Sequence, residues 1–340
     1  MNQIMNQIKS DDMRIFPRME GDCAVPVAMG TDFMPSSFKT IIKEMSDAVF
    51  LTRDDGTFVF VCPNVNNIFG YSSDDVLAME SIYNFLPFSE VDLSSVVGGI
   101  DELVKIPCIT RNRAGNYRHL EVTIKSVEIE EGTRLITCHD TTAEYRLLND
   151  TIVMVSKTLE MRDPYTGGHQ SRVAELAGLL GERLGLTQHE IRGLRLGAQV
   201  HDIGKIAVPQ DILNKPGRIS AAEMELIKVH PRIGFEILSE TSFPWAIAEM
   251  AHQHHERLDG TGYPQGLVGD EIIKEARIIA VADTIEAMTS HRPYRPAKTL
   301  EEAMNVIRDK AGLWYDPEVV AVAEQLLLDG LLPISGWDAT

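Results

Sequence analysis

The stretch His254-His255-Glu256-Arg257-Leu258-Asp259-Gly260-Thr261-Gly262-Tyr263-Pro264 is the part of this sequence from which fold and chemistry can first be predicted. Two adjacent histidines close an apolar helical run, and a loop with two glycines and a proline follows. Neutral imidazole is the commonest metal ligand in proteins, so paired histidines can serve two ions. Gly260 and Gly262 permit a positive φ and Pro264 restricts the exit, so we expect a loop of defined shape. Ion pairs of Glu256, Arg257 and Asp259 are expected to fix this loop. A merely polar helix end is the alternative.

Further nitrogen and carboxylate ligands lie on separate predicted helices, and eight of the ten histidines fall between His169 and His291. The candidate metal ligands are His169, His201, Asp202, His230, His254, His255 and Asp283. Helical bundles build polynuclear metal sites from inward ligands of this kind. His201 and Asp202 diverge by roughly 100° on a helix, so His201 can bind one ion while Asp202 bridges two.

This ligand set favours a particular chemistry. Imidazole and carboxylate without thiolate suit iron, manganese or zinc. Two such ions lower the pKa of a bound water and clamp both oxygens of a phosphoryl displacement. The sequence therefore predicts metal-dependent hydrolysis of a phosphate ester.

Local signals predict that residues 162–332 are mainly helical. Ser220-Ala221-Ala222-Glu223 is a capping box, and we expect its helix to carry His230. The next helix is expected over 245–256, with both histidines of the pair on it, and a further one over 275–289. Proline at the first helical position predicts another helix start at Asp316-Pro317.

Residues 35–142 show a different pattern, with short strands predicted at 48–52, 57–61, 103–111, 117–129 and 133–139. Asp55-Gly56 predicts a tight turn between the first two. The order of these segments resembles a PAS sensor domain, which has an antiparallel sheet with short helices (α+β). The resemblance rests on Ser46-Asp47-Ala48-Val49-Phe50, Asp55-Gly56, Ile68-Phe69-Gly70-Tyr71-Ser72, Arg113-Ala114-Gly115 and His139-Asp140-Thr141-Thr142.

The C-terminal half resembles the HD-GYP family. His201-Asp202-Ile203-Gly204-Lys205 and the 254–264 stretch look like its two signature motifs. The match extends over Arg162-Asp163-Pro164-Tyr165-Thr166, His169, Lys215-Pro216-Gly217, His230-Pro231, Ala280-Val281-Ala282-Asp283 and Arg292-Pro293-Tyr294-Arg295. The resemblance implies an all-α HD-type helical bundle that hydrolyses cyclic di-GMP to pGpG or GMP. It also implies two or three divalent metal ions, with iron expected and manganese as the alternative.

Residue roles follow from this resemblance by position. His169, His201, Asp202 and Asp283 would hold one ion, whereas Asp202, His230, His254 and His255 would serve the others. Lys205 would lie near the scissile phosphate as a fixed positive charge. Arg292 and Arg295 would contact substrate phosphates or guanines, because a guanidinium suits bidentate contacts. Tyr263 would shape the pocket mouth, and Glu160 is the candidate ligand for a third metal.

The resulting domain plan has five parts: a flexible segment 1–34, a PAS-like domain 35–142, a helical linker 143–161, an HD-GYP domain 162–332 and a tail 333–340. The net charge of −18 argues against nucleic acid or an anionic membrane as partner. The sequence shows no signal peptide and no apolar run of the roughly 20 residues that span a bilayer, which predicts a cytoplasmic protein. Cys23, Cys62, Cys108 and Cys138 lack paired spacing and are expected to be reduced thiols.

Two partner predictions and two alternative functions complete this interpretation. We expect a homodimer through the PAS-like domain and the linker helix. Partner signalling proteins are expected at the loop that contains Gly262-Tyr263-Pro264, here called the GYP loop. Regulation by the PAS-like domain is implied, with its ligand unassigned. The substrate could instead be another cyclic dinucleotide such as cyclic GMP-AMP. In a different functional class, the chain would be a cyclic di-GMP receptor or scaffold.

Overall fold

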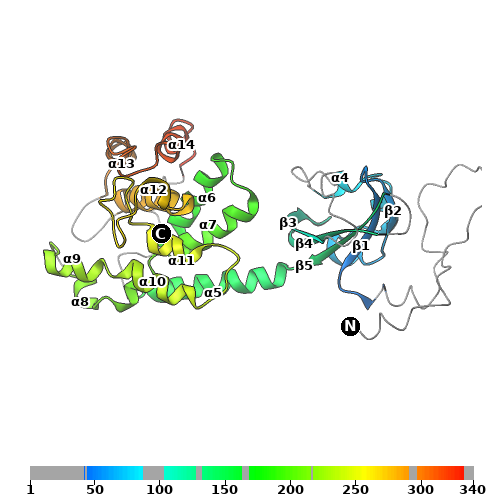
Figure 1. Cartoon of the computed structure of the whole chain (residues 1–340), viewed down its shortest axis with the longest axis horizontal. Helices are drawn as coiled ribbons and strands as arrows, with labels where there is room; N and C mark the ends of the chain where they lie inside the picture. The colour runs from blue at the N-terminus through cyan, green and yellow to red at the C-terminus, as the bar shows by residue number, and fades with distance from the viewer. Residues whose placement is uncertain are drawn as a thin grey trace, which may run out of the picture. The chain divides into compact units, whose positions relative to one another are not determined.

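The computed structural model describes residues 42, 44–86, 103–127, 132–162, 168–215, 217–290 and 297–332. The chain divides into two compact units, one built on the N-terminal sheet and one on the C-terminal helices (Figure 1). The second unit begins at Asp140 and also takes in Ile106–Arg111 and Tyr117–Glu121. This order of a sheet with short helices followed by a helical domain confirms the expected fold class. The predicted segments 1–34 and 333–340 lie outside the described residues.

The N-terminal sheet has five strands in the order β2-β1-β5-β4-β3. The strands are β1 (Ala48–Arg53), β2 (Phe58–Val61), β3 (Val104–Arg111), β4 (Tyr117–Ser126) and β5 (Thr133–Asp140). β1 pairs antiparallel with both β2 and β5, so Phe50 lies opposite Val61 on one side and Ile136 on the other. The predicted turn is present between β1 and β2, because the Gly56 N–H donates to the Arg53 carbonyl at 2.9 Å.

Three short helices connect β2 to the second half of the sheet: α2 (Val65–Phe69), α3 (Ser73–Leu77) and α4 (Ile82–Phe85). A capping box between Ser72 and Asp75 starts α3. The rings of Phe69 and Phe85 lie 4.7 Å apart and both contact Phe50. The sequence did not predict α4, because four residues are too few to show helical periodicity.

The predicted linker is helix α5 (Thr142–Glu160), which has two different faces. One face buries Ile152, Ser156 and Leu159 against α7 (Gln188–Val200). The Ser156 hydroxyl donates to the Gln199 carbonyl at 3.0 Å and accepts from the Gln199 amide at 3.2 Å. The C-terminal half of α5 is therefore packed as part of the helical unit.

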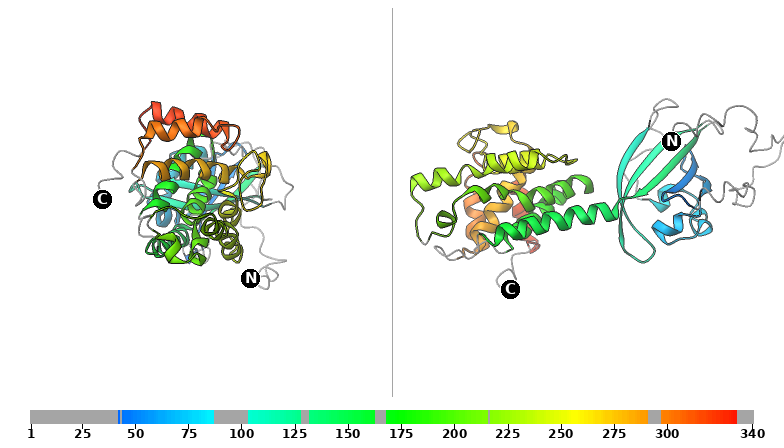
Figure 2. Two further views of the ribbon diagram at one scale, coloured as in Figure 1. Left: turned by 90° about the vertical axis from the view of Figure 1, so that its left-hand side faces the viewer. Right: turned by 90° about the horizontal axis from the view of Figure 1, so that it is seen from below.

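The helical unit surrounds one large apolar core. After α5 and α7, its elements are α6 (His169–Arg183), η3 (Ile203–Ala207), α8 (Gln210–Leu213), α9 (Ala221–Ile227), α10 (His230–Ser239), α11 (Ile247–Gln253), η4 (Gly269–Glu271), α12 (Lys274–Thr289), α13 (Leu300–Arg308) and α14 (Pro317–Leu328). Leu176, Leu180 and Leu194 are fully buried in this core, where truncation to alanine costs about 2–5 kcal/mol. Helices α6 and α7 pack against each other. Figure 2 shows the green, yellow and orange helices of this unit from two further sides.

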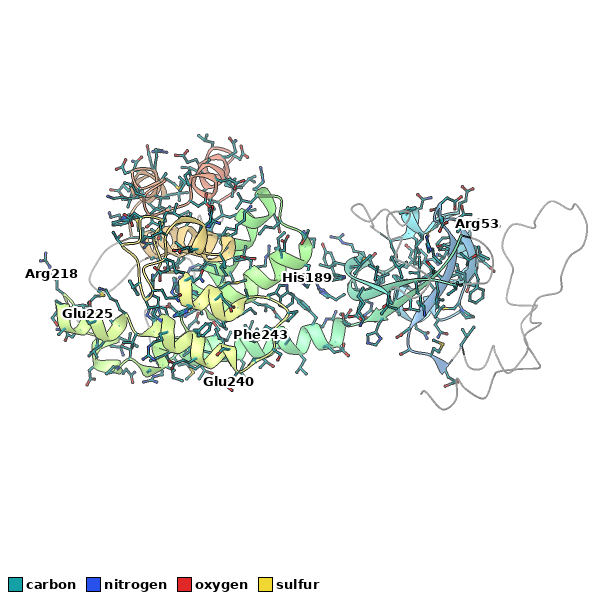
Figure 3. All side chains as sticks on the ribbon, viewed as in Figure 1. Arg53, His189, Arg218, Glu225, Glu240 and Phe243 are labelled. Atoms are coloured by element: carbon teal, nitrogen blue, oxygen red, sulfur yellow. The ribbon has the colours of Figure 1, made fainter. Side chains whose placement is uncertain are left out.

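Arg218 lies just before α9 and Glu225 lies on it, and both side chains project outward (Figure 3). Within the described residues, none of the helices combines the length and apolar character needed to cross a bilayer.

Two helix boundaries differ from the prediction, and both concern metal-ligand candidates. The capped helix α9 ends at Ile227, and His230 is instead the first residue of α10. Pro231 explains the break, because proline is tolerated in the first turn of a helix but not in its interior. Likewise α11 ends at Gln253, so His254 is its C-cap and His255 lies beyond it. Both ligands are thus held at helix ends.

Candidate metal centre

Three histidines share the same backbone anchor. The Nδ1 atoms of His201, His230 and His254 lie 2.6, 2.8 and 2.8 Å from the carbonyl oxygen three residues earlier in the chain. A carbonyl only accepts, so each Nδ1 carries the hydrogen and each neutral ring has its lone pair on Nε2. The local helix-end geometry therefore fixes the tautomer that can bind a metal through Nε2.

These lone pairs meet around Asp202. The Nε2 atoms of His230 and His254 lie 3.3 Å apart, and Asp202 Oδ1 is 3.2 Å from the former and 3.9 Å from the latter. His255 completes this group, with its ring 4.1 Å from that of His254. Two facing lone pairs repel each other unless a cation lies between them. The donor set of three imidazoles and one carboxylate fits a divalent metal ion.

A second group lies on the other side of Asp202 and consists of His169, His201 and Asp202. His201 Nε2 is buried without a hydrogen-bond partner among the described residues and lies 3.4 Å from Asp202 Oδ2. Asp283 reaches this group through His169, whose Nε2 is 3.3 Å from Asp283 Oδ1. Asp202 thus belongs to both groups, which is the arrangement expected of a bridging ligand.

His169 is held by residues that the sequence reasoning missed. Its Nδ1 forms a short hydrogen bond to Glu286 Oε2, and Arg172 binds the other oxygen of that carboxylate. Glu286 is 1% exposed, so this chain of contacts is shielded from water. A carboxylate behind a metal-binding imidazole orients the ring and raises its basicity. The available signal was spacing: Glu286 lies one helical turn after Asp283, and Arg172 one turn after His169.

The pKa shifts of residues in both ligand groups favour the binding of cations. Burial and neighbouring imidazoles hold the pKa of His254 and His255 well below the usual value, so both rings are neutral at pH 7. Burial alone would raise the pKa of Asp202, but Lys205 and His201 hold it well below its usual range. For His169, burial lowers the pKa, yet the hydrogen bonds with Asp283 and Glu286 outweigh it and raise the pKa to about 9. The carboxylates thus favour a positive charge at His169.

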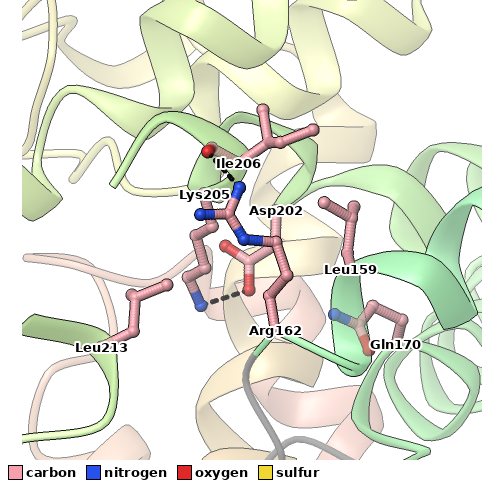
Figure 4. Close-up of a pocket in the computed structure, with 7 residues that line it drawn as sticks. All are labelled: Leu159, Arg162, Gln170, Asp202, Lys205, Ile206 and Leu213. Atoms are coloured by element: carbon pink, nitrogen blue, oxygen red, sulfur yellow. Dashed lines mark hydrogen bonds and ion pairs between the residues drawn. The ribbon is translucent and has the colours of Figure 1, made fainter. Parts of the chain in front are cut away.

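Lys205 lies beside the bridging carboxylate. Its ammonium forms an ion pair with Asp202 Oδ2. Both residues line a pocket with Leu159, Arg162, Gln170, Ile206 and Leu213 (Figure 4). The ammonium therefore stands where it can stabilise negative charge that develops next to the two ligand groups.

A close crossing of η3 and α10 sets the position of Asp202 relative to His230. A Cβ at Gly204 would lie 1.9 Å from the His230 carbonyl oxygen and 2.6 Å from the Gly234 nitrogen. Only glycine fits at this point. Gly204 is thus required because the backbone that follows Asp202 passes directly over the backbone of His230.

The GYP loop is built on Glu256, which is 2% exposed. Its carboxylate accepts hydrogen bonds from the backbone N–H groups of Gln265, Gly266 and Leu267 at 2.7, 3.2 and 3.1 Å. Tyr263, on the same loop, lies with its ring 4.8 Å from that of His255. The loop therefore has a defined shape and places Tyr263 beside the ligand groups.

Two details of the loop differ from the sequence reasoning. Gly260 has a positive φ of 77° as expected, but Gly262 is required for a different reason, because its Cβ would lie 2.4 Å from the Glu256 Cα. Glu256 was expected to fix the loop by ion pairs, whereas it does so by backbone hydrogen bonds. Buried N–H groups need acceptors, and a single carboxylate can satisfy several.

Three predicted site residues are not brought to this centre by the described structure. Glu160 ends α5 and belongs to neither ligand group. Arg292 and Arg295 lie outside the described residues.

The HD domain family matches residues 153–319, a range that contains every ligand named above. The chain carries an HD domain. The matched range lies within the helical unit and contains the adjacent residues His201 and Asp202.

Curated relatives share this domain. The chain is 40% identical over 230 residues to the cyclic di-GMP phosphodiesterase response regulator RpfG of Xanthomonas campestris, covering 66% of this chain and 60% of that protein. It is 42% identical over 187 residues to a cyclic di-GMP phosphodiesterase of Thermotoga maritima, covering 54% and 51%. A 3'3'-cGAMP-specific phosphodiesterase of Vibrio cholerae is 38% identical over 182 residues, covering 54% and 39%. The chain thus spans less than two thirds of each of these relatives.

Two solved structures align with parts of this chain. The cyclic GMP-AMP-specific phosphodiesterase V-cGAP3 of V. cholerae aligns with a TM-score of 0.45 at 23% identity, over 57% of this chain and 51% of that one. A PAS domain of an HTR-like protein from Haloarcula marismortui aligns with a TM-score of 0.28 at 23% identity, over 31% of this chain and 95% of that domain.

Proposed function

We propose that this chain hydrolyses cyclic di-GMP to pGpG or GMP at a centre of two divalent metal ions. The observation that carries the proposal is the sharing of Asp202 between two ligand groups, beside Lys205, in a domain homologous to cyclic dinucleotide phosphodiesterases. When bound, divalent metal ions supply Lewis acidity and an activated water for in-line displacement.

Residues of the chain position the ligand groups, stabilise negative charge and contact the substrate. Asp202 belongs to both ligand groups and keeps them next to each other. The backbone hydrogen bonds of His201, His230 and His254 keep their Nε2 atoms directed inward. Lys205 stabilises the negative oxygens that form as the phosphodiester bond breaks. Tyr263 borders the site next to His255, where a planar base of the substrate has a ring to contact.

The proposal is tested by turnover of the full chain, purified without oxygen and supplied with Fe(II) or Mn(II). Cyclic di-GMP should be converted to pGpG or GMP, and His201→Ala and Asp202→Ala should abolish the activity together with the bound metal. His252→Gln is the matched control, because His252 stacks on Phe235 outside both ligand groups. Undiminished turnover in Asp202→Ala would rule out the metal centre.

Iron is the proposed metal and manganese the alternative, and elemental analysis of the purified chain distinguishes them. Two ions are supported by the two ligand groups. A third ion at Glu160 stays a prediction, and the measured ratio of metal to protein checks it.

A second substrate has specific support. Three V. cholerae relatives named as 3'3'-cGAMP-specific phosphodiesterases are 38%, 39% and 34% identical to this chain. Turnover of cyclic di-GMP and 3'3'-cGAMP, mixed at equal concentration, decides the preference. Tight binding of a cyclic dinucleotide without turnover under either metal would favour the receptor function. The partner proteins expected at the GYP loop would then be sought with the nucleotide-bound chain.

A homodimer through α5 is the proposed assembly. The face of α5 opposite its buried residues exposes Leu147, Met154 and Met161 at intervals of seven, with 70%, 62% and 82% of their surface accessible. Thr151 and Thr158 fall between them, so the stripe has the alternating spacing of four and three of a coiled-coil seam. Such a stripe is self-complementary about a two-fold axis, which favours a second copy of this chain as its partner. Regulation by the PAS-like unit would act through this helix.

A further inference from the structure

The pocket beside Lys205 contains a second cation, Arg162, that the metal centre does not use. The space between its lining residues is about 280 Å³ and includes open solvent. Figure 4 shows the guanidinium of Arg162 and the ammonium of Lys205 near the Asp202 carboxylate. Lys205 is paired with Asp202, whereas no ion pair joins Arg162 to Asp202.

Arg162 is positioned by the backbone. Its Nη1 donates to the Ile206 carbonyl at 2.7 Å, which fixes the guanidinium above η3. A guanidinium has five N–H donors in a planar fork, and this fork matches two oxygens of a phosphate. Anchoring one donor on a carbonyl leaves the group charged and oriented, as an anion-binding residue requires.

Gln170 adds a polar group on the pocket wall. It is 3% exposed, and its Oε1 has no hydrogen-bond partner among the described residues. A buried acceptor without a partner is unfavourable by roughly 1–3 kcal/mol. A ligand that supplies an O–H or N–H at this point would remove that penalty.

The remaining pocket lining selects among parts of a cyclic dinucleotide. Leu159, Ile206 and Leu213 are aliphatic, and none of the described lining residues is aromatic. Nucleobases are held in proteins mainly by stacking on aromatic side chains or by contacts to their edges. A phosphate with its adjoining ribose fits the Arg162 guanidinium and the buried Gln170 acceptor better than a base does.

We propose that this pocket is a subsite for the second, non-scissile phosphate of the substrate, with Arg162 binding the phosphate and Gln170 accepting a hydrogen bond from the adjoining ribose 2'-hydroxyl. The inference rests on the proposed function and deepens it. Arg162 and Gln170 become substrate-binding residues that distinguish a cyclic dinucleotide from a phosphodiester with a single phosphate.

Two substrates separate this subsite from the reaction itself. Bis(p-nitrophenyl) phosphate has one phosphate only, so Arg162→Gln should lower its turnover far less than the turnover of cyclic di-GMP. The same variant should raise KM for cyclic di-GMP by roughly 10- to 100-fold, the loss of a charged hydrogen-bonding pair, with Arg162→Lys intermediate. Arg183→Gln is the matched control, because Arg183 pairs with Asp329 on the surface. An equal loss on both substrates would overturn the subsite while leaving the phosphodiesterase function standing.

The role of Gln170 is tested with a cyclic di-GMP analogue that lacks the 2'-hydroxyls. The unaltered chain should bind the analogue more weakly than cyclic di-GMP, and Gln170→Met should lose this discrimination while keeping its metal content and melting temperature. Unchanged discrimination in Gln170→Met would contradict the assignment. If the unaltered chain hydrolyses neither substrate, the proposed function fails. The subsite is then tested by calorimetry, which measures the affinity of the Mn(II)-loaded chain for cyclic di-GMP. Equal affinity in Arg162→Gln would then overturn the subsite.

Discussion

The Nε2 atoms of His230 and His254 lie 3.3 Å apart, although the Nδ1–H of each ring is directed to a backbone carbonyl. Neither ring can therefore donate to the other in its neutral form. A metal ion bound by both nitrogens would relieve the repulsion between their lone pairs and would link the stability of this fold to metal binding.

Metal removal should therefore destabilise the chain. We expect chelation to lower the melting temperature by several degrees, because a ligand that binds only the folded state stabilises it in proportion to the logarithm of its concentration. Calorimetry with and without a chelator measures the shift. In His230→Ala the shift should shrink, whereas His139→Ala, in the N-terminal sheet, should retain it. A melting temperature that is insensitive to chelation would contradict this link.

Glu286→Gln should weaken metal binding without removing a ligand. The variant loses the charge behind His169 and its pairing with Arg172. Loss of such a supporting carboxylate typically lowers metal affinity by 10–100-fold. Competition with a coloured chelator gives the affinity. Glu324→Gln is the control, since Glu324 pairs with Arg308 away from the site. Equal affinities in both variants would show that Glu286 does not orient His169.

Gly204→Ala should disrupt the site through the backbone. The added methyl group would meet the His230 carbonyl oxygen, which is part of the α10 backbone and has little room to move. Overpacking at such a point costs about 1–3 kcal/mol, occasionally more. Gly234→Ala is the matched control, since its Cβ would meet its neighbours no closer than 3.5 Å. Urea unfolding measures both variants, and similar stabilities would refute the steric argument.

Glu256→Gln should loosen the GYP loop. An amide has one oxygen to accept with and carries no charge, so at least one of the three backbone N–H groups loses its acceptor. We expect faster hydrogen exchange at Gln265, Gly266 and Leu267, with a loss of about 1–3 kcal/mol in local stability. Exchange at Leu180, in the helical core, serves as the internal reference. Unchanged protection of the loop would show that the carboxylate is dispensable.

Met154→Glu should convert a dimer into monomers. The substitution places like charges at the centre of the exposed stripe on α5, where two copies would meet. Sedimentation of the full chain over a range of concentrations gives the assembly state. Leu328→Glu, at an even more exposed apolar residue of α14, should leave it unchanged. Monomers of the unaltered chain at all concentrations would end the dimer proposal.

Much of the architecture could be predicted from local patterns. All five strands were expected close to their observed positions, because alternation and the Asp55-Gly56 turn are properties of neighbouring residues. The helix that carries Asp283 was expected within one residue of its observed bounds for the same reason. The short helices α4 and α8 escaped prediction, since four residues do not establish a period.

The sequence by itself determined which residue types would form the site, because imidazoles and carboxylates in this arrangement suit few other roles. Only the tertiary structure decided how they are held. Glu286 stands behind His169, Glu256 shapes the loop, and Gly204 lets two backbones cross. Each of these relationships joins segments far apart in the chain, so it depends on packing and buried hydrogen bonding, which no local pattern encodes.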